Sequence, residues 1–231
     1  MTVVVPCHNE AENIARYGAE LFPALDALGV SYEVVIVNDG STDATAEAAQ
    51  KLLITRRDTT ILSVHPNRGM GGALRAGFDA AKGEWIATLD ADLTFPPSSI
   101  KDLYAAATSQ KADLASGSPY LRPGDMDGVS WARRMPSLMI NALYRGLFGR
   151  ALTAYTPVFR LYRSSFLKSL PLVSNGFEIN AEIAARALLL KRPVVEVPAP
   201  LLARTAGVSK LQRGRELKRH TALIALLLSG K

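Results

Sequence analysis

Two carboxylates one residue apart are the strongest chemical signal in this sequence. Asp90 and Asp92 directly follow an apolar segment, residues 85–89, that predicts a buried strand. Where the chain leaves the pleat of that strand, both carboxylates can reach one divalent cation, and such hard oxygen ligands suit Mg²⁺ or Mn²⁺. A cation held there would neutralise a diphosphate. The alternative interpretation is an acidic loop in solvent, because the Asp-x-Asp pattern is common.

Two more predicted strands end on polar side chains. The first runs into Pro-Cys-His-Asn-Glu at 6–10, and the second closes on Asn-Asp-Gly-Ser at 38–41. Because ligands of open α/β sheets bind at the carboxyl ends of the strands, we expect these two segments and the Asp90–Asp92 loop to surround one site. Taken singly, Asp39 also fits a turn residue, and Glu10 also fits an acid in the first turn of a helix.

A glycine-rich segment precedes a predicted helix. Gly69, Gly71 and Gly72 allow a close approach of the backbone, and the amino end of the helix suits an anion. The segment is not a dinucleotide-binding fingerprint, because position 74 is Leu, and the chain has no Gly-x4-Gly-Lys phosphate loop. The Gly-x-Ser-x-Gly motif and the zinc-protease His-Glu motif are also absent. The sequence therefore argues against dehydrogenases, P-loop enzymes and these two classes of hydrolase.

Buried strands and helices alternate along the chain. This pattern predicts an α/β fold with a mixed, mostly parallel sheet and helices on both faces. We expect strands at residues 3–5, 34–37, 60–64, 85–89, near 114, at 158–162 and at 194–197. We expect helices at 42–53, 131–148, 178–190 and 210–228, one that runs from the glycine-rich segment to residue 80, and one that opens near residue 9. Asn9 and Glu12 have the spacing of a capping box.

The net charge of +6 is concentrated at the carboxyl end. Residues 204–231 hold seven basic side chains and one acidic side chain, whereas residues 1–203 hold 20 of each. We therefore expect one domain at 1–203, followed by a basic, amphipathic segment at 204–231. That segment either lies at an anionic membrane surface or packs on the domain. A neutral domain argues against a nucleic-acid partner.

Cysteine content and hydropathy exclude two further classes of protein. A single cysteine, Cys7, rules out a disulfide framework and fits a reducing compartment. No apolar run reaches the roughly 18 residues that a spanning helix needs, and no signal peptide opens the chain. We therefore do not expect the chain as given to span a membrane.

Motifs along nearly the whole chain resemble those of one enzyme family. Val-Pro-Cys-His-Asn-Glu at 5–10, Val-Asn-Asp-Gly-Ser-Thr-Asp at 37–43, Asn-Arg-Gly-Met-Gly-Gly-Ala at 67–73 and Asp-Ala-Asp-Leu at 90–93 resemble family 2 glycosyltransferases, which have the Rossmann-like GT-A fold. Ser-Gly-Ser-Pro-Tyr at 116–120, Glu-Val-Pro at 196–198 and Arg-Thr-Ala-Gly-Val-Ser-Lys at 204–210 resemble the dolichyl- or polyprenyl-phosphate mannose synthase branch, as does the pair Arg133 and Ser137.

The resemblance implies three groups of site residues. The nucleoside of a sugar donor would contact Pro6, His8, Glu10, Val37 and Asp39. A divalent metal on the donor diphosphate, Mg²⁺ or Mn²⁺, would be held by Asp90 and Asp92, with Ala91 contributing its backbone. Phosphates of the donor or the acceptor would bind Arg133, Ser137, Arg204 and Lys210. Asp92 and Arg204 would act on the leaving group and are the expected catalytic residues.

The resemblance also implies a reaction. A hexosyl group, best taken as mannose from GDP-mannose, would move with inversion from a nucleotide-sugar donor to a polyprenyl or dolichyl phosphate. That acceptor is already an anion and needs no general base. The alternative is a UDP-sugar donor with a hydroxyl acceptor, which needs a base, and Asp127 and Glu178 are the loose candidates. The enzyme would work at the cytoplasmic face of a membrane, either as a peripheral protein or anchored by segments outside this chain.

Two positions depart from the family pattern. Thr94 stands where such enzymes often have Gln as a further metal ligand, and Pro119 replaces a usual Arg after Gly-Ser. The second change removes one phosphate contact, for which Arg122 is a candidate substitute. The two departures point to a different donor or a weakened enzyme, and they also fit an inactive scaffold.

Overall fold

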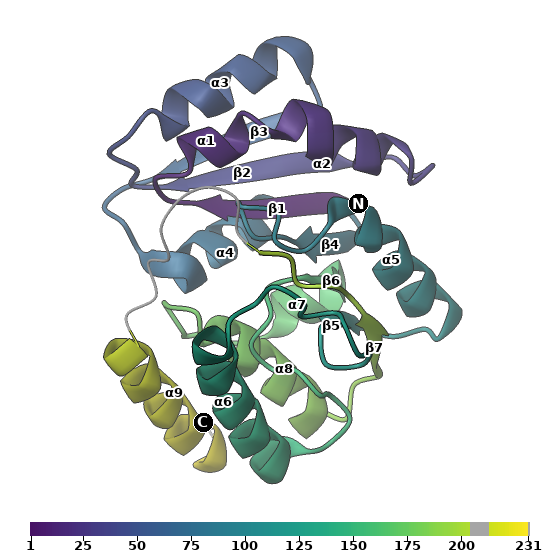
Figure 1. Cartoon of the computed structure of the whole chain (residues 1–231), viewed down its shortest axis with the longest axis vertical. Helices are drawn as coiled ribbons and strands as arrows, with labels where there is room; N and C mark the ends of the chain where they lie inside the picture. The colour runs from purple at the N-terminus through teal and green to yellow at the C-terminus, as the bar shows by residue number, and fades with distance from the viewer. Residues whose placement is uncertain (204–212, 231) are drawn as a thin grey trace.

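A seven-stranded sheet forms the centre of the protein in a computed structural model, which describes residues 1–203 and 213–230 apart from the side chains of residues 132, 133 and 213 (Figure 1). The strands lie in the order β3-β2-β1-β4-β6-β5-β7. Their bounds are β1 Thr2–Cys7, β2 Glu33–Asp39, β3 Thr59–Val64, β4 Trp85–Thr88, β5 Leu114–Ser118, β6 Arg160–Arg163 and β7 Val194–Pro198. Only β6 runs antiparallel to its neighbours among these strands, which confirms the expected mostly parallel sheet.

Helices cover both faces of this sheet, as the alternating sequence pattern predicts. They are α1 Ala11–Ile14, α2 Tyr17–Asp26, α3 Thr45–Thr55, α4 Gly69–Ala80, α5 Ile100–Ser109, α6 Trp131–Phe148, α7 Ser164–Ser169, α8 Ile179–Leu189 and α9 Arg213–Leu228, with a 3₁₀ turn at Pro97–Ser99. Successive residues of a strand point to opposite faces. Val3 and Val5 accordingly join the core under α1, α2, α3 and α5, whereas Val4 joins the core under α4, α6, α8 and α9.

The strand order reverses beside β1. The chain proceeds outward from β1 through β2 to β3 on one side, and β4 then pairs with the other edge of β1. Loops that leave the carboxyl ends of β1 and β4 therefore diverge to opposite faces, and the crevice between them is where open α/β sheets bind ligands. The fold thus places the three polar segments found in the sequence at one edge of the sheet.

The structure corrects the predicted start of the first helix. Asn9 has a left-handed backbone, with φ of 53°, and α1 begins only at Ala11 with no side-chain cap. Oδ1 of Asn9 instead accepts a hydrogen bond from the backbone N–H of Thr42 at 2.7 Å. The Asn9–Glu12 capping box is therefore wrong, because Asn9 joins the loops after β1 and β2.

The basic carboxyl-terminal segment contains α9, which packs on the domain. Leu223, Ile224 and Leu227 are buried in the core shared with α6 and α8. These three side chains hold the apolar half of α9 on the domain. Arg204 and Lys210 lie outside the described residues. Within the described ranges, no helix is long and apolar enough to cross a membrane.

Candidate functional site

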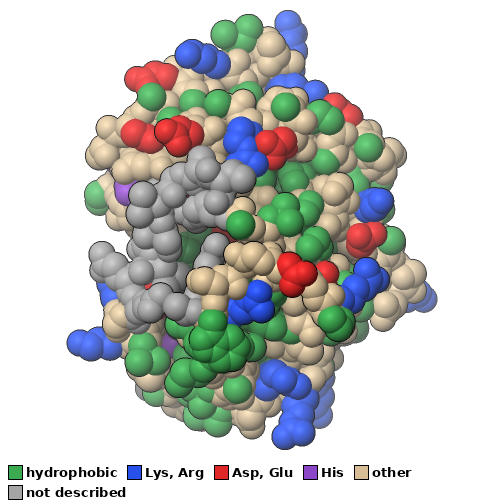
Figure 2. All heavy atoms as spheres, in the orientation of Figure 1, with side chains coloured by type: hydrophobic (Ala, Val, Ile, Leu, Met, Phe, Trp, Pro, Cys, Tyr) green, Lys and Arg blue, Asp and Glu red, His purple; other side chains and the backbone are tan. Residues whose placement is uncertain are grey.

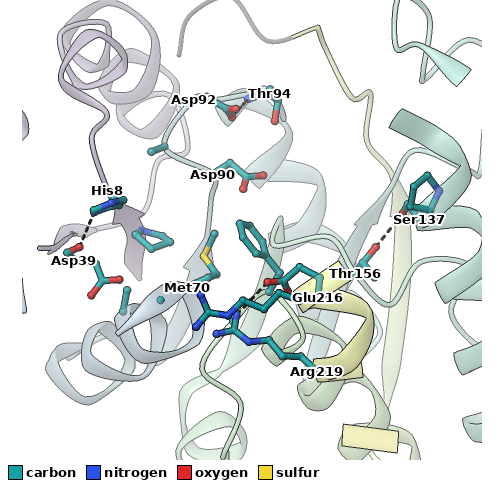
Figure 3. A pocket seen from close by; sticks show the side chains of 18 of the residues that line it. His8, Asp39, Met70, Asp90, Asp92, Thr94, Ser137, Thr156, Glu216 and Arg219 are labelled. Atoms are coloured by element: carbon teal, nitrogen blue, oxygen red, sulfur yellow. Dashed lines mark hydrogen bonds and ion pairs between the residues drawn. The ribbon is translucent and has the colours of Figure 1, made fainter. Parts of the chain in front are cut away.

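A pocket of about 1380 Å³ opens at the carboxyl ends of β1, β2 and β4 (Figure 3). The sheet contributes residues 6–10, Asp39 and the loop from Asp90 to Thr94. The amino end of α4 and parts of α6 and α9 complete the lining. The crossover point of the sheet and the pocket therefore coincide, and the site draws on segments from both ends of the chain.

Asp39 ties three segments of the pocket wall together. It is 3% exposed, and its Oδ1 accepts a hydrogen bond from the backbone N–H of Arg68 at 2.7 Å. The carbonyl of Asp39 accepts a second bond from Nδ2 of Asn67 at 2.8 Å, and Nδ1 of His8 lies 2.9 Å from the same carbonyl. This arrangement presents the His8 ring and the Asp39 carboxylate beside each other at one end of the pocket (Figure 3).

The loop after β4 brings the two predicted metal ligands into the pocket. Asp90 and Asp92 both line it. The backbone N–H of Thr94 donates to Oδ1 of Asp92 at 3.1 Å, and the buried hydroxyl of Tyr17 donates to the carbonyl of Ala91 at 3.0 Å. Hydrogen bonds from the Thr94 backbone and the Tyr17 side chain therefore fix the shape of this loop. Thr94 is itself 4% exposed and supports Asp92 through its backbone.

The glycine-rich segment has a different use from the expected one. Gly69 opens α4 with φ of 77°, and a Cβ on it would lie 2.5 Å from the carbonyl oxygen of Asn175. A Cβ on Gly71 would lie 2.3 Å from the carbonyl oxygen of Ser174. The N–H of Gly71 donates to the carbonyl of Asn175 at 2.9 Å, so this group does not serve an anion. The glycines let the segment before α8 pack directly on α4.

Ser137 lies at the centre of a hydroxyl network on α6. Its Oγ accepts hydrogen bonds from the hydroxyl of Tyr120 at 2.9 Å and from Nδ2 of Asn141 at 3.3 Å. The same atom lies 3.2 Å from Oγ1 of Thr156. Ser137, Tyr120 and Thr156 all line the pocket, so the network fixes three hydroxyl groups on one wall (Figure 3).

Glu196, from the Glu-Val-Pro motif, supports the segment that carries Thr156. Its carboxylate accepts hydrogen bonds from the backbone N–H groups of Thr153 at 2.6 Å and Ala154 at 3.0 Å. It does not line the pocket. This part of the family resemblance therefore marks a structural support rather than a ligand contact.

α9 supplies charged groups to another wall of the pocket. Nη1 of Arg219 donates to Oε1 of Glu216 at 3.1 Å, and both residues line the pocket (Figure 3). Burial raises the pKa of the Glu216 carboxyl, Arg219 opposes that shift, and the charge of Glu178 adds to it. Nδ1 of His220 lies 3.0 Å from the hydroxyl of Tyr144, and burial lowers the pKa of His220.

The structure brings together most of the residues that the sequence singles out. The predicted residues that line the pocket are Pro6, His8, Glu10, Asp39, Asp90, Ala91, Asp92 and Ser137. Val37 is a correction. It is fully buried in the core against Gly77 and does not line the pocket, because its side chain points beneath α4. Nothing is described of the Arg133 side chain, of Arg204 or of Lys210.

The candidate bases and one of the two departing positions, Pro119, lie outside the pocket lining, whereas Thr94 lines it. Asp127 is exposed and Glu178 is buried, with Oε1 of Glu178 accepting from the N–H groups of residues 175 and 176, and neither lines the pocket. Pro119 is buried and does not line the pocket. Arg122 is exposed and does not line the pocket. Its position therefore gives no support to Arg122 as a replacement for the phosphate contact that the family's usual arginine at position 119 would make.

Four arginines that line the pocket are not among the residues that the sequence singles out: Arg68, which precedes α4, and three arginines on two helices. Arg134, Arg215 and Arg219 line the pocket from α6 and α9. Arg134 also donates from Nε to the carbonyl of Val129 at 2.7 Å, which holds the loop before α6. The sequence offers one signal for the three helical arginines, which is their spacing from the apolar positions of the same helix. This signal can be used only once it is known which face of each helix packs on the domain.

Comparison with known proteins decides the family. A family model described as glycosyl transferase family 2 matches residues 2–170. The chain belongs to this family. Among curated proteins, the undecaprenyl-phosphate 4-deoxy-4-formamido-L-arabinose transferase of Edwardsiella ictaluri (strain 93-146) is 34% identical over 212 residues. The match covers 91% of this chain and 62% of that enzyme, so this chain spans less than two thirds of the length of its relative.

Solved structures of other glycosyltransferases share the fold. Glucosyl-3-phosphoglycerate synthase from Mycobacterium tuberculosis, solved with Mn²⁺, UDP and phosphoglyceric acid, superposes with a TM-score of 0.71 at 20% identity, covering 99% of this chain and 77% of that one. The mannosyltransferase PcManGT from Pyrobaculum calidifontis, solved with GDP-Man and Mn²⁺, gives a TM-score of 0.67 at 18% identity, with coverage of 96% and 62%. These likenesses confirm the GT-A fold expected from the motifs.

Proposed function

We propose that this family 2 glycosyltransferase moves a sugar from a nucleoside-diphosphate donor to the phosphate of a polyprenyl phosphate. One observation carries the proposal: a single pocket holds the Asp90–Asp92 carboxylate loop together with the arginines of α6 and α9. Guanidinium groups bind phosphate oxygens through paired hydrogen bonds and keep their charge at any physiological pH. A pocket with both groups suits two phosphorylated substrates at once. The 34% identical relative, which is named for an undecaprenyl-phosphate acceptor, supports the same class.

The Asp90–Asp92 loop fits a divalent metal ion. Its donors are two carboxylates, Asp90 and Asp92, and among the described residues no group of three or more Asp, Glu, His or Cys side chains is placed to hold a metal ion. Mg²⁺ and related ions are commonly held by one or two carboxylates, with substrate phosphates and water completing the coordination. Bound there, the ion would supply charge neutralisation for the departing diphosphate.

The remaining steps belong to the side chains. An oxygen of the acceptor phosphate forms the new bond to the anomeric carbon, while the bond from that carbon to the donor diphosphate breaks and the nucleoside diphosphate leaves with the electron pair. Attack from the opposite face inverts the anomeric centre. Asp92 and Arg204 are the proposed catalytic residues, because both would act on the charge that develops on the leaving group. No proton has to be removed from the acceptor phosphate, in keeping with the positions of Asp127 and Glu178 outside the pocket lining.

The walls of the pocket suggest how each substrate lies. Pro6, His8, Glu10 and Asp39 would surround the nucleoside, and the hydrogen bonds of Asp39 hold that end rigid. Ser137 would fix the wall near the phosphates as the hub of its network, since its Oγ already accepts two hydrogen bonds. Arg133, Arg204 and Lys210 remain proposed phosphate contacts.

Donor identity is the finer part of the proposal. Mannose from GDP-mannose stays the first donor to test, on the strength of the motif resemblance. UDP-linked sugars are the second choice. Because the relative is named for a formamido-arabinose, modified pentoses are also donors to test. We place the reaction at the cytoplasmic surface of a membrane, where a lipid-borne phosphate is presented to water.

A transfer assay tests this function. Purified protein, Mn²⁺ or Mg²⁺, a polyprenyl phosphate and a panel of labelled GDP- and UDP-sugars are combined, and label is counted in the organic extract. We expect one donor to give lipid-linked label that disappears without metal and in Asp92→Ala, while Asp127→Ala retains it. If every donor leaves the extract unlabelled while a soluble glycan acceptor becomes labelled, the phosphate-acceptor proposal is wrong and the hydroxyl-acceptor reaction replaces it.

A further inference from the structure

The outer face of α6 is apolar along its whole length. Among the α6 side chains that the structure describes, which exclude residues 132 and 133, none of the exposed ones is charged or polar. The exposed positions are Trp131, Pro136, Met139, Ala142, Leu143, Gly146 and Leu147. Trp131 and Met139 are 66% and 67% exposed. Figure 2 shows the corresponding gathering of hydrophobic side chains over α6, in the lower half of that face of the molecule.

An ordinary surface helix turns an apolar stripe inward and a charged side outward. α6 buries Tyr144 and Phe148 in the core, but its outer face is apolar as well. In α6 the polar residues Ser137 and Asn141 point toward the pocket and the core, where they hydrogen bond to each other. Contiguous exposed apolar surface of this kind marks an interaction site. Because Arg134, Ser137 and Ile140 line the pocket from the same helix, whatever covers the outer face of α6 lies directly beside the pocket.

We propose that the outer face of α6 is the surface that rests on an anionic lipid bilayer. The inference rests on the proposed function in one respect, because a lipid-borne acceptor must reach the pocket from a membrane. The helix would lie in the plane of the interface, with Met139, Leu143 and Leu147 at the level of the acyl chains and the pocket opening beside them.

Charge around α6 favours a lipid surface over a protein partner or a second copy. Residues 131–150, which comprise α6 and the two residues after it, contain four basic side chains and no acidic one. Arg150 is exposed just beyond the end of α6, and Lys218 is exposed on α9, which the Tyr144–His220 contact holds beside α6. Basic residues near an anionic leaflet are attracted to it. Two copies of so basic a surface would repel each other.

The position of a tryptophan and the packing of α9 add to this argument. Trp131 stands at the first residue of α6, and tryptophan is enriched where membrane and water meet. The apolar half of α9, the other candidate for membrane contact, is already used in the core through Leu223, Ile224 and Leu227. The exposed apolar stripe of α6 has no such partner among the described residues.

Vesicle co-sedimentation of the whole chain tests the surface. The probes are vesicles of phosphatidylcholine alone and of phosphatidylcholine with phosphatidylglycerol. We expect binding to the anionic vesicles, weakened by salt, and a drop in the partition coefficient of about tenfold or more in the double variant Trp131→Ala, Met139→Gln. The matched control is Ile54→Gln, since Ile54 is an 82% exposed apolar residue on α3, and this variant should bind as the wild type does.

Three results would overturn the inference. One is equal vesicle binding by the double variant and the wild type. A second is an equal loss in the Ile54→Gln control. A third is a dimer of the wild-type chain in sedimentation equilibrium that the double variant abolishes, since α6 would then be covered by a second copy.

A water-soluble short-chain prenyl phosphate separates this inference from the proposed function. The double variant should transfer sugar to it at the wild-type rate and lose transfer only to vesicle-borne acceptor. If the double variant loses vesicle binding but the wild type transfers sugar to no prenyl phosphate, the α6 surface is supported and the proposed acceptor is rejected. If both proteins transfer sugar to prenyl phosphates and bind vesicles equally, the proposed acceptor is supported and the α6 surface is rejected.

Discussion

Tyr17 is a positioning residue for the loop that carries Asp90 and Asp92, and its hydroxyl can be removed cleanly. The side chain is fully buried in α2, far from the loop in sequence, and its hydroxyl donates to the carbonyl of Ala91 at 3.0 Å. Ala91 is 6% exposed, so water does not readily replace that donor. Tyr17→Phe should therefore leave a buried carbonyl unpaired, at a cost of about 1–3 kcal/mol.

Part of this cost should appear in ligand binding. If the loop relaxes in the variant, binding must restore its shape, and about 1.4 kcal/mol spent in this way weakens binding tenfold. We expect the dissociation constant for Mn²⁺ with a nucleoside diphosphate to rise by about tenfold, measured by titration calorimetry. Tm should fall by about 2–4 °C for each kcal/mol lost in a chain of this size.

A second tyrosine provides the matched control. Tyr155 is also fully buried, and its hydroxyl donates to the carbonyl of Gly149 at 2.8 Å, away from the pocket lining. Tyr155→Phe should lower Tm comparably and leave nucleotide affinity unchanged. Equal nucleotide affinity in Tyr17→Phe and Tyr155→Phe would refute the positioning role, because Tyr17 would then contribute to stability alone.

Two further outcomes follow from the pocket walls. Gly71→Ala should destabilise the fold and weaken nucleotide binding, because the new Cβ would lie 2.3 Å from the Ser174 carbonyl oxygen. The control is Gly18→Ala, whose Cβ would meet no atom within 4 Å, and it should be neutral or stabilising by up to about 1 kcal/mol. Thermal melts of both variants measure the difference. The raised pKa of Glu216 means that its contribution to stability is present at low pH and is lost as pH rises through that pKa. The difference in Tm between wild type and Glu216→Gln should therefore grow with pH in the variant's favour, and a pH-independent difference would contradict the raised pKa of this buried carboxyl.

Local patterns in the sequence predicted the sheet and much of the pocket, because polar residues directly after apolar strands must gather at one sheet edge. Asp39, Asp90 and Asp92 were found in this way. Tertiary contacts decided the rest. Asn9 has the spacing of a helix cap, but it bonds to the β2 loop. Val37 belongs to a recognisable motif, but strand alternation turns it into the core.

Helix faces were the least predictable feature. The sequence of α6 does not reveal that Ser137 lies inward, because this depends on the hydroxyl network with Tyr120 and Thr156. The same applies to Arg219, which reaches the pocket only because Leu223 and its neighbours dock α9 on the domain. A local pattern cannot specify which of two packing partners a helix meets.

The central claim is that Asp90 and Asp92 hold a metal ion with the donor diphosphate in this pocket. Calorimetric titration of UDP and GDP, each with and without Mn²⁺, tests it most directly. Asp92→Asn is the sharpest variant, because its amide oxygen can still accept the hydrogen bond from the N–H of Thr94. The exposed Asp127→Asn is the control. We predict that Mn²⁺ tightens nucleotide binding by the wild type and the control, and that Asp92→Asn loses at least about tenfold of that affinity. Unchanged metal-dependent binding by Asp92→Asn would contradict the assignment of the site.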